Sequence, residues 1–112
     1  MSRKLNYDDF ARTGYQDCGN TFDVRDHHDA WRRLGKPRSG ASVARKVVLA
    51  AWGDDTDVYE DWLSQNDVDE MIQDGLEPRS AYKMWRNAWQ DCAESAVKNR
   101  LKEWIARDEE GR

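Results

Sequence analysis

At 112 residues the chain has the length of a single domain, and 36% of its residues are charged, against about 25% in an ordinary soluble domain. Its six tryptophans, four tyrosines and two phenylalanines supply large buried areas, which argues against a disordered chain. No apolar run approaches the roughly 18 residues that a transmembrane helix needs, and the first residues lack the apolar segment of a signal peptide. The composition therefore predicts a cytoplasmic protein.

The apolar residues recur at intervals of three and four, and no window alternates in the way a half-buried strand does. This pattern predicts an all-α fold. We expect a single domain over residues 1–112, built as a small bundle of about five to six helices.

The first two expected helices have clear start and stop signals. Asn6 can cap a first helix, which residues 19–20 (Gly-Asn) can end. Thr21 or Asp23 can open a second helix, which the glycine and proline within residues 35–37 end.

The third and fourth expected helices follow closely. Ser39 or Ser42 can start a third helix that ends at Gly53. Asp57 and Glu60 have the spacing of a capping box, which predicts the start of a short fourth helix.

The last part of the chain predicts a short helix and a long one. Asp67 with Glu70 makes a second possible capping box. Pro78 suits the first position of a helix, and nothing interrupts the pattern until about Asp108. A helix over about 78–108 would be roughly 45 Å long.

Three tryptophans, Trp85, Trp89 and Trp104, lie on an apolar stripe of this long helix. We expect the stripe to form the core against which the earlier helices fold. An alternative is that part of it pairs with a second copy or a partner. Base stacking is disfavoured, because stacking aromatics usually alternate with basic residues and this helix is nearly balanced in charge.

The net charge of −4 conceals two adjacent blocks of opposite sign. Residues 30–53 carry no acid and six basic residues: Arg32, Arg33, Lys36, Arg38, Arg45 and Lys46. Residues 54–77 carry no base and ten acids: Asp54, Asp55, Asp57, Glu60, Asp61, Asp67, Asp69, Glu70, Asp74 and Glu77. Ten like charges this close repel one another, so the acidic block calls for an explanation beyond solvation.

Our main hypothesis is that the acidic block binds a protein partner with a basic surface. Carboxylates on short helices can imitate the phosphates that arginine and lysine recognise on a nucleic-acid-handling protein. Tyr59 and Trp62 could be apolar anchors among the acids. The expected contact residues are Asp54, Asp55, Asp57, Tyr59, Glu60, Asp61, Trp62, Asp67, Asp69, Glu70 and Asp74. Size and charge resemble those of host-defence antagonists carried by viruses and mobile elements, an analogy that rests on no motif.

A second hypothesis assigns nucleic-acid binding to the basic block. The second and third helices, joined by a tight GKPRSG turn, have the outline of a helix-turn-helix. Against this, the third helix offers only Arg45 and Lys46 as long donors for reading bases. A third possibility is a self-assembling component, a homo-oligomer formed through the C-terminal helix and the complementary charge blocks.

The sequence offers little for catalysis, and we expect neither enzyme activity, a cofactor nor a metal. Asp23 and His27, four residues apart, could share a metal ion, but no third ligand is evident. We expect one of His27 and His28 to lie against the core. Cys18 and Cys92 match no metal or redox spacing, and we expect reduced, mostly buried thiols.

Overall fold

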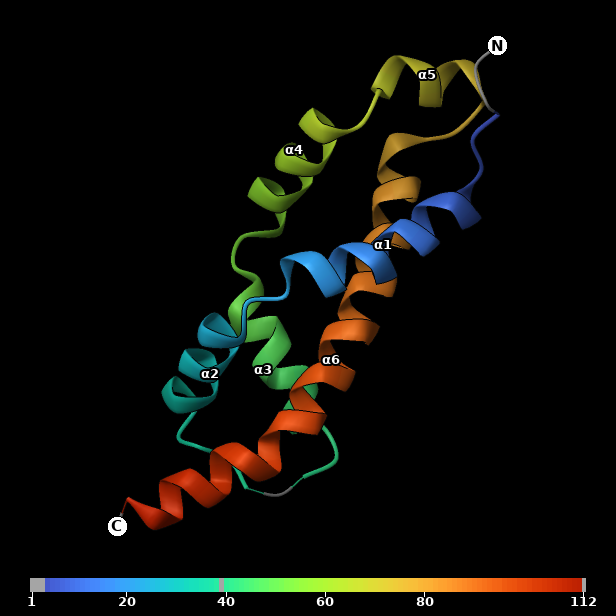
Figure 1. The fold of residues 1–112 in the computed structure, drawn as a ribbon. Coiled ribbons are helices and arrows are strands. Elements are labelled where there is room, and N and C mark those ends of the chain that lie inside the picture. The colour runs from blue at the N-terminus through green and yellow to red at the C-terminus, as the bar shows by residue number, and fades with distance from the viewer. Residues whose placement is uncertain (1–3, 39, 112) are drawn as a thin grey trace.

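The computed structural model describes residues 4–38 and 40–111, and within these ranges the chain forms six α-helices and no strand (Figure 1). The helices are α1 (Tyr7–Thr21), α2 (Val24–Arg33), α3 (Val43–Trp52), α4 (Asp55–Gln65), α5 (Val68–Gln73) and α6 (Pro78–Glu110). The prediction of an all-α fold with a long C-terminal helix is confirmed, and α6 ends two residues beyond the expected 108. None of the helices in the described ranges combines the length and apolarity that crossing a bilayer requires.

The molecule is elongated because α6 determines its length. At 33 residues α6 is about 50 Å long, and the whole molecule measures 60 × 22 × 22 Å. Its radius of gyration, 16.6 Å, exceeds the roughly 13 Å of a compact domain of this length. In Figure 1, α2, α3, α4 and α5 follow one another along α6 from its C-terminal end to its N-terminal end, and α1 crosses it.

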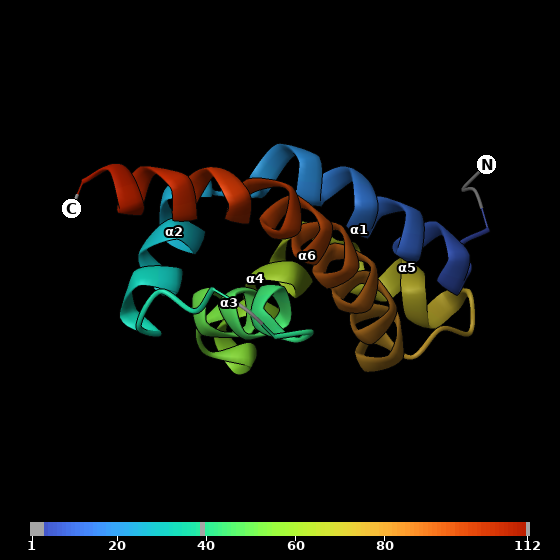
Figure 2. The same cartoon turned by 90° about the horizontal axis from the view of Figure 1, so that it is seen from below.

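Helix α1 runs in the same direction as α6 and is bound to it along its length (Figures 1 and 2). The Tyr7 hydroxyl accepts the Glu77 backbone N–H at 3.2 Å, near the start of both helices. The Trp85 indole N–H donates to Asp17 (2.7 Å), and the Trp89 indole N–H donates to Thr21 (3.0 Å). These bonds satisfy the polar edges of two large side chains of α6, as buried indoles require.

Two apolar clusters form along α6, one towards each end. The first, the α2/α3 core, joins α2, α3, the end of α1 and α6 from residue 89 onwards, around Trp31, Trp89 and Trp104. The second, the α4/α5 core, joins the start of α1 with α4, α5 and the first turns of α6 around Trp62 and Tyr82. The tryptophan stripe of α6 is thus covered by the chain's own helices, so the prediction that it forms the core is confirmed.

The aromatic rings of residues 52 and 85 connect the two cores. Trp52 and Trp85 pack against both clusters, with ring centroids 6.1 Å apart. Trp52 also lies edge-on to Trp89 (4.9 Å), and Trp85 lies 6.4 Å from Trp62. Self-association through the stripe stays a prediction, and the rings that it would use already pack within the molecule.

Several predicted caps are confirmed by their hydrogen bonds. Asn6 and Asp9 form a reciprocal capping box at the start of α1. Asp23 caps α2 by accepting two backbone N–H groups, and Asp67 caps α5. Ser42 precedes α3 without a side-chain capping bond, and the alternative start at residue 39 lies outside the described residues.

Two predicted helix boundaries are wrong. Helix α1 continues through residues 19–20 to Thr21, because its last turn is held to α6 by the bond from Trp89. Helix α4 begins at Asp55 and not at the predicted capping box of residues 57 and 60. The positive φ of Gly53 (82°) turns the chain directly after α3, so Asp54 is already in place to cap α4.

We predict that Gly14→Ala destabilises the fold. A Cβ at Gly14 would lie 2.9 Å from the Ala88 Cβ and 3.1 Å from the Trp89 backbone nitrogen, and it would also meet the Trp85 carbonyl oxygen. Because backbone atoms cannot move aside, we expect a loss of about 1–3 kcal/mol in the free energy of unfolding, measured with urea.

The matched control is Gly19→Ala in the same helix. A Cβ there meets nothing within 4 Å, so the better helix propensity of alanine should stabilise the protein by about 0.5–1 kcal/mol. Equal effects of the two substitutions would contradict the close approach of α1 to α6.

Candidate functional site

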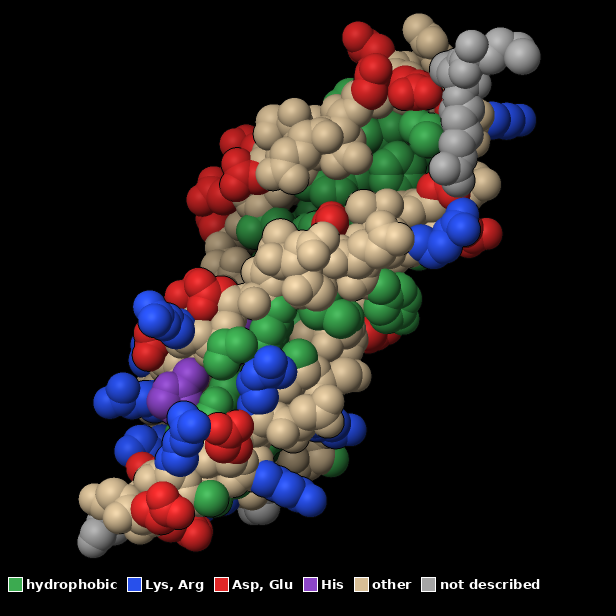
Figure 3. All heavy atoms as spheres, viewed as in Figure 1, with side chains coloured by type: hydrophobic (Ala, Val, Ile, Leu, Met, Phe, Trp, Pro, Cys, Tyr) green, Lys and Arg blue, Asp and Glu red, His purple; other side chains and the backbone are tan. Residues whose placement is uncertain are grey.

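The acidic block of the sequence becomes a surface on α4 and α5. Figure 3 shows acidic side chains along the outer edge of α4 and beside α5. The exposed members are Asp54, Asp57, Glu60, Asp61, Asp67, Asp69 and Glu77, and the partly buried ones are Asp55, Glu70 and Asp74. We call the exposed carboxylates of residues 54–69 the acidic face.

Some of these carboxylates have structural roles. Asp54 accepts the Thr56 backbone N–H (2.8 Å) and Asp67 accepts that of Glu70 (3.0 Å), so both cap helices. Asp74 accepts the Leu5 backbone N–H at 2.7 Å and joins the N-terminal segment to the end of α5. Within the acidic face, whose residues are all described, the acids with no such role are Asp57, Glu60, Asp61 and Asp69.

Asp55 is a fixed group and not part of the acidic face. One of its oxygens accepts hydrogen bonds from the Tyr82 hydroxyl (2.6 Å), the Arg86 guanidinium (3.2 Å) and the Trp52 indole (3.2 Å). Burial acts to raise the pKa of Asp55, but these donors outweigh it and the pKa lies below its ordinary value. Burial and the bond to Asp55 raise the pKa of Tyr82. The bonds hold the start of α4 against α6.

The two predicted aromatic anchors do not both reach the surface. Trp62 is only 4% exposed and packs between Phe10 and Tyr82, with ring centroids 5.5 and 5.6 Å away. Its assignment as a partner-binding residue is therefore wrong: it fills the α4/α5 core. Tyr59 is half-buried, and the Arg79 guanidinium lies 4.9 Å from its ring centroid.

A hollow with both polar and apolar lining opens beside the acidic face, between α5 and the start of α1 (Figure 3). Its volume is about 300 Å³. Leu5, Phe10 and Met71 form its apolar wall, and Asp67 and Glu70 are on its rim. The sequence did not predict this hollow, because residues some sixty positions apart form it.

The basic block is divided between two environments. Lys36 and Arg38, in the loop after α2, bind Asp108 at the end of α6, and Arg38 also binds Glu109. Exposed basic residues remain on α2 (Arg32 and Arg33) and α3 (Arg45 and Lys46). In the described parts of the chain, the ion pairs of both blocks are with α6 and not with each other.

The connection between α2 and α3 differs from the tight turn that the sequence suggested. It spans residues 34–42, longer than the three or four residues of a helix-turn-helix. The Trp31 indole donates to the Pro37 carbonyl (3.0 Å), and Lys36 adopts a positive φ of 56°. The described residues of the loop contact α2 through the Trp31 indole and α6 through Lys36 and Arg38.

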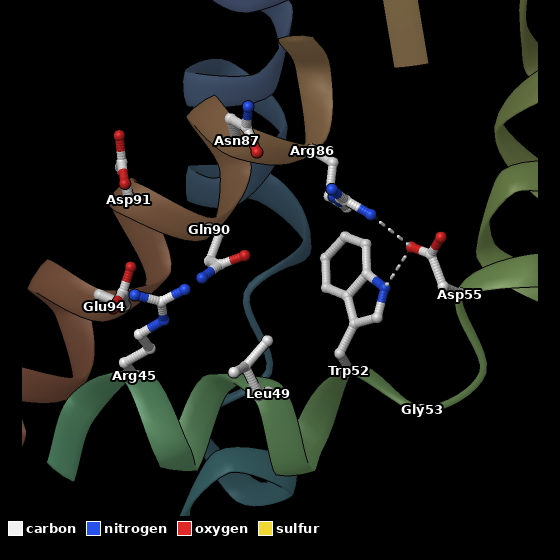
Figure 4. A pocket seen from close by; sticks show the side chains of 10 residues that line it. All are labelled: Arg45, Leu49, Trp52, Gly53, Asp55, Arg86, Asn87, Gln90, Asp91 and Glu94. Atoms are coloured by element: carbon white, nitrogen blue, oxygen red, sulfur yellow. Dashed lines mark hydrogen bonds and ion pairs between the residues drawn. The ribbon is translucent and has the colours of Figure 1, made fainter. Parts of the chain in front are cut away.

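A polar groove of about 740 Å³ lies between α3 and α6 (Figure 4). Arg45 and Glu94 approach one another at one end of it, and Arg86 and Asp55 are paired at the other. The lining holds no serine, cysteine, histidine or lysine. It carries two arginines, Arg45 and Arg86, and three carboxylates, Asp55, Asp91 and Glu94.

The cysteines lie together where α1 meets α6. Both are free thiols, Cys18 buried and Cys92 partly buried. Burial, together with a hydrogen bond to the Cys92 thiol, raises the pKa of Cys18 to about 12. Across residues 4–38 and 40–111, no three His, Cys, Asp or Glu side chains are grouped in a way that could hold a metal ion.

Comparison with protein-family models, with curated proteins and with solved structures found no match for this chain. The candidate site is therefore argued from its own geometry.

His27 is the buried histidine of the pair, 4% exposed, and His28 is half-buried, which agrees with the expectation that one of them faces the core. The His27 Nδ1 lies 2.8 Å from the Asp23 carbonyl, so Nδ1 carries the hydrogen. Among the described side chains, its Nε2 is buried without a hydrogen-bond partner. Burial lowers the pKa of His27 despite the nearby Asp23 and Asp26.

We predict that His27 makes the fold sensitive to mild acid. Below its ordinary pKa of 6.5 the unfolded chain binds a proton that the folded chain does not, so stability falls as pH falls from about 6.5 towards the lowered pKa. The slope from this group approaches about 1.4 kcal/mol per pH unit. Urea denaturation across this pH range should show that His27→Phe removes this slope.

The control is His28→Gln, which changes the neighbouring, half-buried ring. It should keep the slope of the unmodified protein. An unchanged slope in His27→Phe would mean that the buried imidazole does not control stability in this range.

Proposed function

We propose that the protein is a small helical binding module, an inhibitor or adaptor, whose acidic face occupies a basic surface on a nucleic-acid-handling protein. One observation carries this proposal. Four carboxylates are exposed and form no ion pair within the described part of the chain: Asp57, Glu60, Asp61 and Asp69.

Unpaired carboxylates of this kind favour an external partner. The ion pairs that the fold itself uses lie elsewhere, at Asp55–Arg86 and at the end of α6, so the acidic face is not needed to hold α4 in place. Its mutual repulsion costs stability that a basic partner would relieve. In this proposal the carboxylates of α4 and α5 take the place of the phosphate groups that the partner's arginine and lysine side chains would otherwise bind.

The hollow beside the acidic face supports a protein partner over a free cation. An apolar side chain of the partner could rest against the partly exposed Leu5 while its basic neighbours reach Asp67 and Glu70. An apolar anchor surrounded by charge is the usual arrangement of an interface hot spot. Tyr59 remains as a half-buried aromatic at the edge of this surface.

We predict that Glu60→Lys/Asp61→Lys weakens binding of a labelled arginine-rich peptide that carries one central leucine. Fluorescence anisotropy at about 50 mM salt should show that the affinity for the peptide falls about tenfold or more, since attraction is replaced by repulsion. Both side chains are exposed and cap no helix, so the circular dichroism should not change.

The matched control is Asp91→Lys/Glu110→Lys, which changes the net charge by the same amount at exposed sites on α6. It should weaken binding far less. Equal losses in the two variants would show that only net charge matters and would refute the acidic face as a specific surface.

A further inference from the structure

A second groove lies between α2 and the C-terminal part of α6, at the opposite end of the molecule from α5 (Figure 1). Its volume is about 430 Å³. Arg25, His28 and Arg32 of α2 line it on one side, and Trp104 and Arg107 of α6 line it on the other. Figure 3 shows this region as basic side chains gathered around a histidine and apolar groups. We call it the α2/α6 groove.

Helical spacing places the α2 residues of this groove on one stripe. Arg25, His28 and Arg32 are three and four positions apart, so their side chains share a face. The two arginines lie one on each side of His28, about 10 Å apart along the helix. The acids of α2, Asp26 and Asp29, do not line the groove.

The groove has an aromatic floor. The His28 ring lies 5.7 Å from the Trp31 ring at an interplanar angle of 27°, and 5.1 Å from the Trp104 ring. Trp31 and Trp104 are buried, whereas His28 is half-buried. Of these three rings only that of His28 is partly exposed, so the imidazole is the aromatic surface that a ligand would meet.

The cations of the groove differ in how far the chain neutralises them. Lys36 binds Asp108 at 2.6 Å, and Arg107 binds Glu103 at 2.7 Å across two exposed side chains. Arg25 and Arg32 are exposed, and no carboxylate within the described ranges pairs with them. The groove thus offers two guanidinium groups on either side of an aromatic ring, while its one lining carboxylate, Asp108, is already held by Lys36 and Arg38.

We propose that the α2/α6 groove binds single-stranded nucleic acid, with Arg25 and Arg32 on phosphates and an unstacked base against His28. Alternation of cations with an aromatic ring is the arrangement that binds single strands, because the arginines follow the backbone and the ring accepts any base. A duplex has no free base face to offer the ring. The proposal does not depend on the acidic face.

This surface differs from the one that the sequence suggested for nucleic acid. Of the six basic residues in that block, only Arg32 and Lys36 line the α2/α6 groove. Arg45 and Lys46 are exposed on α3, away from it. The two surfaces can therefore be tested against each other.

The test is fluorescence anisotropy of a labelled oligothymidine strand at about 50 mM salt, with the full chain. Arg25→Glu/Arg32→Glu should weaken binding at least about tenfold, whereas Arg45→Glu/Lys46→Glu, an equal change in charge, should weaken it less than about threefold. His28→Ala should weaken binding about fivefold or more through lost stacking. Added salt should weaken binding of the strand by the unmodified protein. Binding by Arg25→Glu/Arg32→Glu should depend less on salt.

Four results would overturn the proposal. The first is no anisotropy change with the unmodified protein, and the second is equal weakening by the two charge-reversal pairs. The third is tighter binding of the matching duplex than of the single strand. If the unmodified protein self-associates without binding the strand, and Arg25→Glu/Arg32→Glu abolishes that self-association, the groove binds a second copy of the chain instead. Circular dichroism of each variant controls for folding, since all four arginine and lysine positions are exposed.

Discussion

The close approach of α1 to α6 at Gly14 is the constraint on which the other contacts depend. A helix as long as α6 cannot bury its tryptophan stripe alone, and α1 covers the N-terminal part of it while satisfying the indole N–H groups of Trp85 and Trp89. Only a residue without a side chain allows the two backbones to come this near. With α1 in that position, it takes part in both cores, with Phe10 in the α4/α5 core and Cys18 in the α2/α3 core.

This division into two cores also separates the charges of the molecule. Helices α4 and α5 carry the acids and contribute few large side chains to their core, chiefly Trp62 and Met71, so their outer surfaces are left to carboxylates. Helix α2 and its loop bring basic groups to the other end, where the end of α6 neutralises some of them. The two regions lie at different positions along α6, and among the described residues the opposite charges that are adjacent in the sequence form no ion pair with each other. Each end is available for a different partner, which is the basis of both proposals.

Local signals predicted more of the fold than of the candidate site. The helical spacing of apolar residues and the caps at Asn6, Asp23 and Asp67 depend on neighbours within a few positions, and these predictions hold. The start of α4 was missed because two aspartates in succession can each cap, and the turn at Gly53 decides between them. The burial of Trp62 was missed because a tryptophan among acids has the same local sequence whether it faces solvent or a core that distant residues build.

By itself, the sequence determined that the chain is helical, that its last helix is long, and that its charge lies in two blocks, because hydrogen bonds within helices and the spacing of side chains are local properties. Only the tertiary structure decided which charged groups stay free. Asp55 and Lys36 are neutralised by residues of α6 far away in the chain, while Asp61 and Arg25 are not. The α2/α6 groove likewise exists only once Trp104 packs beside His28. Ion pairing and groove formation depend on distances through space, and those follow from how the helices pack against α6.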